Sequence, residues 1–389
     1  MKRIFLFLAL CLCSCVSASA QDFHFEDMTA SVECLPRINL IVDISQVNKE
    51  TLTKAEVEIK NFALPDNMVE RYHCSIKYRG ASSIGYSKKS FALKIEDEQG
   101  EKMDANLLGL RLENNWVLDA MAVDRLRMRN RVCFDIWNEI SKTPYETDFE
   151  NRNGTVGKFV EVFINGDYHG LYCLTDKIDR KLLGLKKYKE NKGGTNTVRG
   201  ILYKGVSWGV SSGLLGYDDE ANVDDVVWNE FELVYPDDIP SIDTWKPLMD
   251  LIDFCSASTP NMEFENNYIA WFYKENLVDF VAFSQLLDVN DNLYKNNFLS
   301  TPNIESGHRW LLSPWDMDMS LGGNFDGDYK DETTWLERYI YCAPFNRLYK
   351  NNVEGFADDV WERIVDLATS LLTVEKMDER LEAYVSLFM

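Results

Sequence analysis

Histidine and net positive charge are what this 389-residue chain has least of. Its four histidines are scattered and form no metal-ligand pattern. Lysine and arginine number 41 against 63 acidic residues, which gives a formal charge of −22. Nucleic-acid binding needs clustered basic residues that neutralise phosphates, so this deficit argues against a nucleic-acid partner. An acidic surface is compatible with a basic protein partner, and it also serves solubility.

Several motifs and one kind of segment are missing as well. There is no P-loop, no dinucleotide-binding glycine fingerprint and no Gly-x-Ser-x-Gly nucleophile motif. No apolar run after residue 20 is long enough to predict a transmembrane helix. The wide spacing of the six cysteines after residue 20 argues against a zinc site; they are Cys34, Cys74, Cys133, Cys173, Cys255 and Cys342. Disulfides and free buried thiols both stay open at this point.

The first 20 residues have the pattern of a secretory signal peptide. Two cations precede an apolar run from Ile4 to Leu12, and Ala18-Ser19-Ala20 supplies the small residues for cleavage after Ala20. A lipoprotein modified at Cys15 is the less favoured alternative. We therefore expect an exported protein, whether periplasmic, cell-surface or secreted, in which residues 21–34 form a linker.

Apolar periodicity predicts strands first and helices later. Alternating apolar residues predict strands over 39–43, 54–61, 72–78, 90–96 and 200–204, and a hairpin over 159–175 that turns at Asn165-Gly166. Helical spacing predicts helices after Asp124, over 245–254 and 269–287, and two more within 356–385. Residues 207–240 are expected to be mostly irregular. We therefore expect an α+β protein, with a β-rich region over 35–205 and a helical region over 206–389.

The chain is organised around the stretch from Asp288 to Gly323. Asp291 and Asn296 stand five positions apart, and Asp316 follows at the end of an apolar run that forms the second side of a short strand pair. This is the spacing of a protein-kinase active site, where the first Asp orients the substrate hydroxyl and the other two residues hold magnesium on ATP. An Asp-x-x-x-x-Asn match alone is weak, because Asp and Asn are ordinary turn residues. Both motifs at this separation favour a phosphotransferase.

With these residues in view, the sequence resembles the spore-coat protein H (CotH) family of atypical kinases. The segments that carry the resemblance are 79–83, 88–91, 115–118, 126–130, 160–166, 168–172, 291–297 and 314–318. The resemblance implies a two-lobed kinase-like fold, ATP with Mg²⁺ or Mn²⁺, and transfer of the γ-phosphoryl group to Ser or Thr of exported proteins. It makes Asp291 the catalytic residue, and Asn296 and Asp316 metal ligands. Asn292 departs from the family pattern, in which glycine is expected after the Asp.

Asp318 is a further metal-ligand candidate, and its alternative is a turn residue that bonds to the segment Ser320–Gly323. A kinase also needs groups that hold the ATP phosphates. The candidates for nucleotide binding are Arg79, Ser82, Ser83, Lys89, Lys94 and Glu161.

Two of these candidates follow from strand patterns. Lys94 lies on the strand face opposite Phe91 and Leu93, so it would point into a cleft. Glu161 lies on a strand that is otherwise apolar on both faces, and a buried acid needs a partner. A lysine of the nucleotide lobe is one option for that partner, and water at an edge strand is the other.

Two other functions stay open. A catalytically silent surface-binding protein or adhesin on the same scaffold would gain from the export signal and the acidic surface. A metal-dependent glycosyltransferase would use Asp316-x-Asp318 as its metal motif and leave Asp291 and Asn296 without a role. The first alternative predicts no response to ATP and metal, and the second predicts stabilisation by a nucleotide-sugar.

Overall fold

A computed structural model describes residues 35–62, 68–145, 151–190, 196–237, 239–289, 291–307, 309–324, 326–329 and 342–388. The expected signal peptide, Cys15 and the linker over 21–34 lie outside the described residues. In the described part of the chain, no helix has both the length and the apolar character needed to cross a bilayer.

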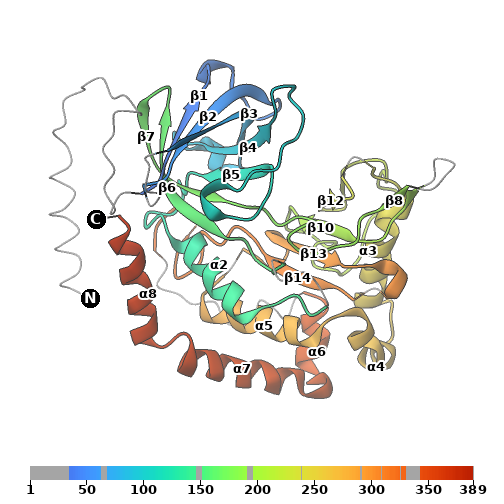
Figure 1. Ribbon diagram of the computed structural model, residues 1–389. Coiled ribbons are helices and arrows are strands. Elements are labelled where there is room, and N and C mark those ends of the chain that lie inside the picture. Colours follow the sequence, from blue (N-terminus) through green and yellow to red (C-terminus); the bar gives the residue numbers. More distant parts are fainter. Residues whose placement is uncertain are drawn as a thin grey trace.

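The first half of the chain closes into a barrel of seven strands (Figure 1). The strands are β1 (Arg37–Ile41), β2 (Thr53–Lys60), β3 (Val69–Arg79), β4 (Ser90–Glu96), β5 (Asn115–Asp119), β6 (Gly157–Ile164) and β7 (Asp167–Thr175). Their order is β1-β2-β3-β4-β5-β7-β6, and the parallel pairing of β1 with β6 closes the barrel. Alternate residues point inward, so Phe91, Leu93 and Ile95 of β4 are buried in the barrel core.

The predicted hairpin of β6 and β7 is confirmed, and its turn helps to close the barrel. Asn165 and Gly166 have φ values of 52° and 87°, which is the left-handed pair that an Asn-Gly turn supplies. The side chain of Asn165 donates to the carbonyl of Val42 at 2.8 Å and accepts from its amide at 2.9 Å. The turn therefore holds the chain just after β1, and supports the parallel pairing next to it.

A second sheet lies below the barrel in Figure 1, in the order β11-β12-β10-β13-β14. Its strands are β10 (Ile201–Gly205), β11 (Val227–Trp228), β12 (Phe231–Tyr235), β13 (Asn297–Thr301) and β14 (Leu311–Pro314), and β8 (Lys189–Glu190) pairs separately with β9 (Asn196–Thr197). The helices are α2 (Arg129–Ile140), α3 (Ile242–Cys255), α4 (Asn261–Trp271), α5 (Lys274–Leu286), α6 (Phe345–Lys350), α7 (Phe356–Ser370) and α8 (Val374–Ser386). We call the second sheet and these helices the helical half.

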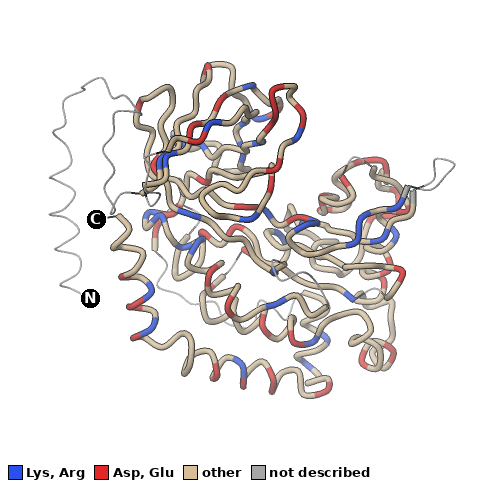
Figure 2. The backbone as a smooth tube through the Cα atoms, in the orientation of Figure 1, with Lys and Arg blue, Asp and Glu red and all other residues tan. Residues whose placement is uncertain are grey.

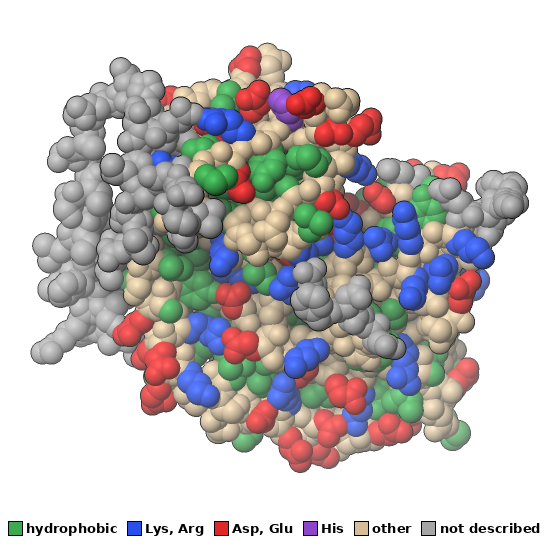
Figure 3. All heavy atoms as spheres, viewed as in Figure 1, with side chains coloured by type: hydrophobic (Ala, Val, Ile, Leu, Met, Phe, Trp, Pro, Cys, Tyr) green, Lys and Arg blue, Asp and Glu red, His purple; other side chains and the backbone are tan. Residues whose placement is uncertain are grey.

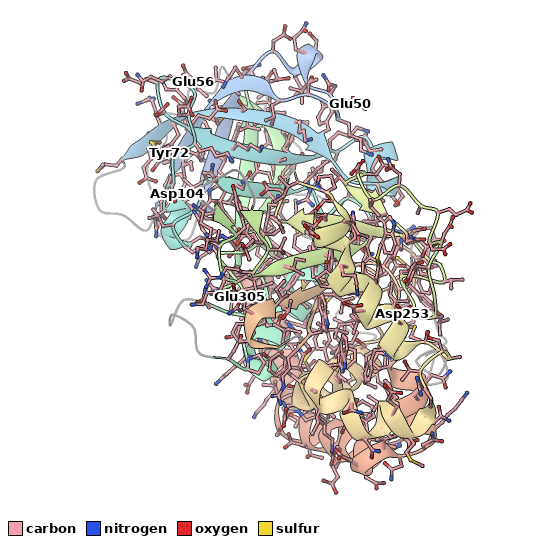
Figure 4. All side chains as sticks on the ribbon, turned by 90° about the vertical axis from the view of Figure 1, so that its right-hand side faces the viewer. Glu50, Glu56, Tyr72, Asp104, Asp253 and Glu305 are labelled. Atoms are coloured by element: carbon pink, nitrogen blue, oxygen red, sulfur yellow. The ribbon has the colours of Figure 1, made fainter. Side chains whose placement is uncertain are left out.

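The two halves have separate cores that meet along the outer face of the barrel. Phe159 and Cys173 point out of β6 and β7 and belong to the core of the helical half. The last helix, α8, returns to the barrel, where the ring of Phe159 lies 5.6 Å from Tyr384 and 4.9 Å from Phe388. Lys181, which follows β7, pairs at 2.9 Å with Asp104, which is labelled in Figure 4. The last helix and the segment after β7 are therefore both in contact with the barrel.

The mixture of strands and helices is confirmed, but its division along the chain differs from the expectation. The strand expected over 200–204 appears as β10, and it pairs with β12 and β13 in the helical half. β11 and β12 occupy part of 207–240, which was expected to be mostly irregular. Sequence periodicity shows that a strand is amphipathic, but not which sheet it joins, because pairing partners lie far away along the chain.

Two helix boundaries also differ. The helix expected over 269–287 is divided into α4 and α5, because the amide of Trp310 bonds to the carbonyl of Trp271 at 2.7 Å and a β-bridge forms at Phe272. Asp124 lies five residues before the start of α2. Its carboxylate nevertheless accepts the amides of Met128 and Arg129, both at 2.8 Å, so it still satisfies the free N–H groups of that helix.

The cysteines in the described part of the chain are free and buried; they are Cys74, Cys133, Cys173, Cys255 and Cys342. Burial raises the pKa of each thiol, to about 12 for Cys74 in the barrel. Cys34 lies outside the described residues. The alternative of free buried thiols therefore holds for these five positions.

Candidate active site

The hairpin of β13 and β14 brings Asn296 and Asp316 together. Asn297 pairs with Pro314, so the residues just beyond the strands face each other, and the amide of Trp315 donates to the carbonyl of Asn296 at 2.8 Å. Asn296 and Asp316 have φ values of 54° and 58°, in the left-handed region. This conformation costs about 1–2 kcal/mol for most L-residues and least for Asn and Asp, and such backbone strain clusters at functional sites.

The side chain of Asp291 is held on both of its oxygens. Oδ2 accepts hydrogen bonds from the side-chain amide of Asn296 at 2.8 Å and from the ammonium of Lys295 at 2.9 Å. Oδ1 accepts the indole N–H of Trp208 at 3.0 Å. Because donors bond to both oxygens, the carboxylate has one defined orientation. Asp291 and Asn296 are therefore direct neighbours, as their spacing predicts.

Asn292 acts as the scaffold of this loop. Its side-chain amide is buried and donates to the carbonyls of Asn296 at 2.6 Å and Trp315 at 2.7 Å. Its own carbonyl accepts the side chain of Asn297 at 2.8 Å. A glycine would supply none of the side-chain bonds. The departure from the expected glycine thus ties the Asp291 loop to the end of β14.

The carboxyl groups of Asp316 and Asp318 both have raised pKa values. Burial and then the charge of Asp119 raise the pKa of Asp316, although Lys204 and Arg79 act in the opposite direction. The pKa of Asp318 is raised well above its usual value by burial and by other carboxylates, Asp316 first. Asp316 is open to water but lies among atoms of both halves, as a residue on the floor of a cleft does.

No hydrogen bond or ion pair reaches the carboxylates of Asp316 and Asp318 from the described residues. The alternative role of Asp318 is therefore not seen: the turn that follows closes through backbone bonds, from Ser320 to Met317 at 3.3 Å and from Gly323 to Ser320 at 2.9 Å. Carboxylates that raise one another's pKa and have no bonded partner fit a divalent cation, whose charge would offset the cost of burial and the repulsion.

Three cations lie near these acids, and they are Arg79, Lys204 and Lys295. Arg79, from the end of β3, and Lys204, from β10, lie over the ring of Trp315 at 5.6 and 5.9 Å. Burial lowers the pKa of Arg79, and Asp119, Asp316 and Glu232 oppose the shift. Burial also lowers the pKa of Lys204, and the charges of Arg79 and Lys295 lower it further. Positive groups thus reach this site from the barrel, the second sheet and the Asp291 loop.

A cavity opens between the barrel and α2. Its lining includes Arg79, Ser83, Asp119, Asn130 and Asp316. Figure 2 shows acidic and basic positions mixed along both halves, and Figure 3 shows Lys and Arg side chains gathered on the face where the halves meet. Of the charges described above, Arg79, Asp119 and Asp316 line this cavity.

The other predicted nucleotide-binding residues differ in whether they line this cavity. Ser83 lines it, whereas Ser82 of the same turn is exposed and is not part of the lining. The ammonium of Lys89 donates to the carbonyls of Ile84 and Tyr86, so it closes that turn. Lys94 of β4 pairs in the sheet with Ser75 and Asn115, and it is not part of the cavity lining.

Glu161 lies away from the other candidates. It pairs with Arg37 of β1 at 2.6 Å, and both side chains are largely buried. Neither of the two options considered from the sequence, a lysine of the nucleotide lobe or water, matches this partner. The parallel pairing of β1 with β6 brings the two residues together, although they are 124 positions apart in the chain.

Sequence reasoning missed several residues that the site contains. Asn130 of α2 accepts the amide of Met317 at 3.1 Å and donates to Asp119 at 3.3 Å, so it links α2 and β5 to the segment between Asp316 and Asp318. A signal for Lys204 exists in the sequence, because it is the one charged residue in the otherwise apolar strand β10. Lys295 stood inside the Asp-to-Asn motif. Asp119 had no signal of its own.

A model of the CotH kinase protein family matches residues 76–389. The chain belongs to the CotH kinase protein family. The CotH match begins within β3 and includes the loop after it, α2, the Asp291 loop and the β13–β14 hairpin. No curated protein sequence matches the chain at a significant level. Family membership indicates a kinase-like enzyme.

Proposed function

We propose that this CotH family member is an exported, metal-dependent kinase that transfers the γ-phosphoryl group of ATP to a Ser or Thr hydroxyl of extracytoplasmic or surface proteins. One observation carries the proposal. Asp291, Asn296 and Asp316 lie at one end of the β13–β14 hairpin, and Arg79, Lys204 and Lys295 stand beside them. Phosphoryl transfer needs little covalent chemistry from the protein; it needs positioning and charge neutralisation, and this set of groups supplies both.

Asn296 and Asp316 are the residues that would hold Mg²⁺ or Mn²⁺, with Asp318 as a further ligand. In the described part of the chain no three acidic, His or Cys side chains converge to bind a metal by themselves. Magnesium sites of this class use one or two protein ligands and take the rest from nucleotide phosphates and water. When bound, the ion would neutralise charge on the phosphates during transfer.

The other residues have separate roles in the proposal. Arg79, Lys204 and Lys295 bind the phosphate oxygens. Asp291 accepts the proton of the acceptor hydroxyl, whose oxygen forms the new bond to the γ-phosphorus as the bond from that phosphorus to the bridging oxygen breaks. ADP leaves with that electron pair. Asn296 and Lys295 hold the Asp291 carboxylate in place for this step.

In this proposal the barrel serves as the nucleotide-side lobe and the helical half as the substrate-side lobe of a kinase-like fold. The signal-peptide pattern of residues 1–20 supports export. The acidic surface supports a protein substrate over a nucleic acid. ATP supply outside the cytoplasm is a requirement that the proposal places on the protein's surroundings.

The test uses the mature chain from residue 21, purified free of nucleotide. We expect ATP with Mn²⁺ or Mg²⁺ to raise the melting temperature, and γ-³²P to pass to a protein acceptor. Asp291→Asn should abolish transfer and retain ATP binding. Stabilisation by a nucleotide-sugar and not by ATP would replace the kinase with a glycosyltransferase. No response to either nucleotide at saturating metal would leave a silent scaffold and overturn the proposal.

A further inference from the structure

Trp208 is an exposed tryptophan that contacts the proposed catalytic carboxylate. Its side chain is 47% exposed, which is high for so large an apolar group. Its indole N–H donates to Oδ1 of Asp291 at 3.0 Å, and its ring lies 4.9 Å from the ring of Tyr294. Tyr294 belongs to the same loop as Asp291. The indole is therefore bonded at one edge and packed beside Tyr294, and about half of it stays open to solvent.

The two oxygens of Asp291 face different surroundings. Oδ2 is directed toward Asn296 and Lys295, on the side of the metal ligands and phosphate-binding cations. Oδ1 is directed toward Trp208 and has capacity for a second hydrogen bond, because a carboxylate oxygen accepts two. An acceptor hydroxyl that bonds to Oδ1 would lie next to the indole. The residues that flank that hydroxyl would then meet the surface around Trp208.

The segment that carries Trp208 presents an ordered apolar surface. Val206, Val210 and Leu215 are exposed along with it, at 37%, 59% and 42%. The amide of Leu215 bonds to the carbonyl of Val210 at 3.0 Å, so these two residues lie on the same turn. Apolar groups exposed together beside a functional site indicate a binding surface.

Contacts with Glu230 and Tyr294 hold this segment in place. Glu230 accepts the amides of Ser211 and Ser212 at 2.8 and 3.2 Å, and its carbonyl accepts the amide of Val206 at 2.9 Å. Gly213 approaches the ring of Tyr294 so closely that a Cβ there would lie 2.6 Å from it. The segment that carries the apolar surface is thus held against the Asp291 loop.

We propose that Trp208, Val210 and Leu215 form the acceptor subsite, and that this subsite selects a polypeptide whose phosphorylated Ser or Thr is flanked by an aromatic or large aliphatic side chain. The inference rests on the proposed kinase function and names its substrate class. Trp208 has two separable roles. Its ring provides the surface for the flanking side chain, and its N–H positions Asp291.

The experiment compares peptides with a single Ser that differ at one flanking position, which carries Phe, Leu, Gly or Asp. The flanking positions from two before to two after Ser are scanned. At the sensitive position we expect the wild-type kcat/KM to be about 10-fold higher for Phe than for Gly, the size expected when one aromatic side chain is buried on another. Trp208→Ala should remove this preference, chiefly through a raised KM for the Phe peptide.

Trp208→Phe separates the two roles. It keeps a ring and lacks the N–H, so it should retain the preference for Phe while lowering kcat by a similar factor for every peptide. The matched control is Trp361→Ala on α7, because Trp361 is 43% exposed and its N–H bonds to the hydroxyl of Tyr349 at 2.8 Å, away from the site. Melting temperatures with and without ATP and Mn²⁺ report folding and nucleotide binding for each variant.

The outcomes distinguish this inference from the proposed function. Wild-type protein that binds no ATP and phosphorylates no peptide overturns the proposed function, and the acceptor subsite with it. Wild-type protein that transfers phosphate without regard to the flanking residue overturns the subsite alone. So does a Trp208→Ala variant that keeps the wild-type preference. Loss of the preference in Trp208→Ala, with ATP stabilisation intact and Trp361→Ala unchanged, supports it.

Discussion

Two pairs of charged side chains, one on the barrel and one on the helical half, differ in whether the protein supplies their hydrogen-bond partners. On the barrel, Lys88 donates to the carbonyl of Ala120 at 3.0 Å and to that of Leu171, and it lies 4.3 Å from the ring centre of Tyr172. Burial lowers its pKa to about 8. Lys89 is bonded to two carbonyls in the same manner. These cations therefore stabilise the end of the barrel itself.

On the helical half, Asp316 and Asp318 have raised pKa values and no bonded partner among the described residues. Lys88 and Lys89 are satisfied by the fold, whereas the ionised forms of Asp316 and Asp318 stay costly until a cation binds. In the proposed kinase, this difference assigns the metal chemistry mainly to the second sheet. The barrel contributes a wall and, through Arg79, one cation.

Asp316→Ala is expected to have the largest effect. It removes a proposed metal ligand, so transfer should fall by roughly 10³-fold or more, and Mn²⁺ should no longer raise the melting temperature in the presence of ATP. The same change should stabilise the unliganded protein, because it removes a carboxylate that other carboxylates, Asp119 first, repel. The exposed Asp378→Ala on α8 is the control. Full activity in Asp316→Ala would mean that the unpaired acids serve no ligand.

Lys295→Met tests whether the cations of the helical half act on phosphate. The change removes the ion pair with Asp291 and one of the three positive groups, so kcat should fall about 10²-fold. Single-turnover transfer at saturating ATP measures it, with the exposed Lys350→Met on α6 as the matched control. If only the KM for the acceptor changed, Lys295 would belong to the acceptor side and not to the phosphates.

Asn130→Ala tests the connection between the halves. Asn130 does not bind the metal in our proposal, but it holds the backbone between Asp316 and Asp318, so Mn²⁺ affinity should fall by about 10- to 100-fold. The effect is measured by titrating Mn²⁺ at fixed ATP. Asn138→Ala is the control on the same helix, since Asn138 bonds at 2.9 Å to the carbonyl of Thr155 and should affect stability alone. Equal metal affinity in the two variants would remove Asn130 from the site.

Glu161→Gln should have the smallest effect and should not change activity. It weakens one ion pair of the barrel whose side chains are only 15% and 26% exposed, so we expect the free energy of unfolding to fall by about 1–3 kcal/mol. Urea unfolding measures that loss, and an ATP titration checks the site. A marked loss of ATP affinity would show that the barrel wall takes part in the chemistry, and the contrast between the two halves would no longer hold.

Local pattern accounts for much of what could be predicted. The Asn165-Gly166 turn, the β13–β14 pair and the helices after residue 242 follow from turn chemistry and periodicity over a few residues. The closeness of Asp291 and Asn296 follows from a five-residue spacing. The predictions that were wrong depend on contacts between residues far apart in the chain. The division between α4 and α5 depends on a contact with Trp310, and the partner of Glu161 depends on a parallel pairing between distant strands.

The sequence by itself determined the family, the acidic character of the chain and the motif that contains Asp291, Asn296 and Asp316, because all of these are properties of neighbouring residues or of composition. Only the tertiary structure decided which charges share one site. Arg79, Asp119, Asn130, Lys204 and Trp208 come from separate elements, and their contacts arise when the barrel, α2 and the second sheet pack together. Side chains far apart in the chain interact only at the distances that this packing sets.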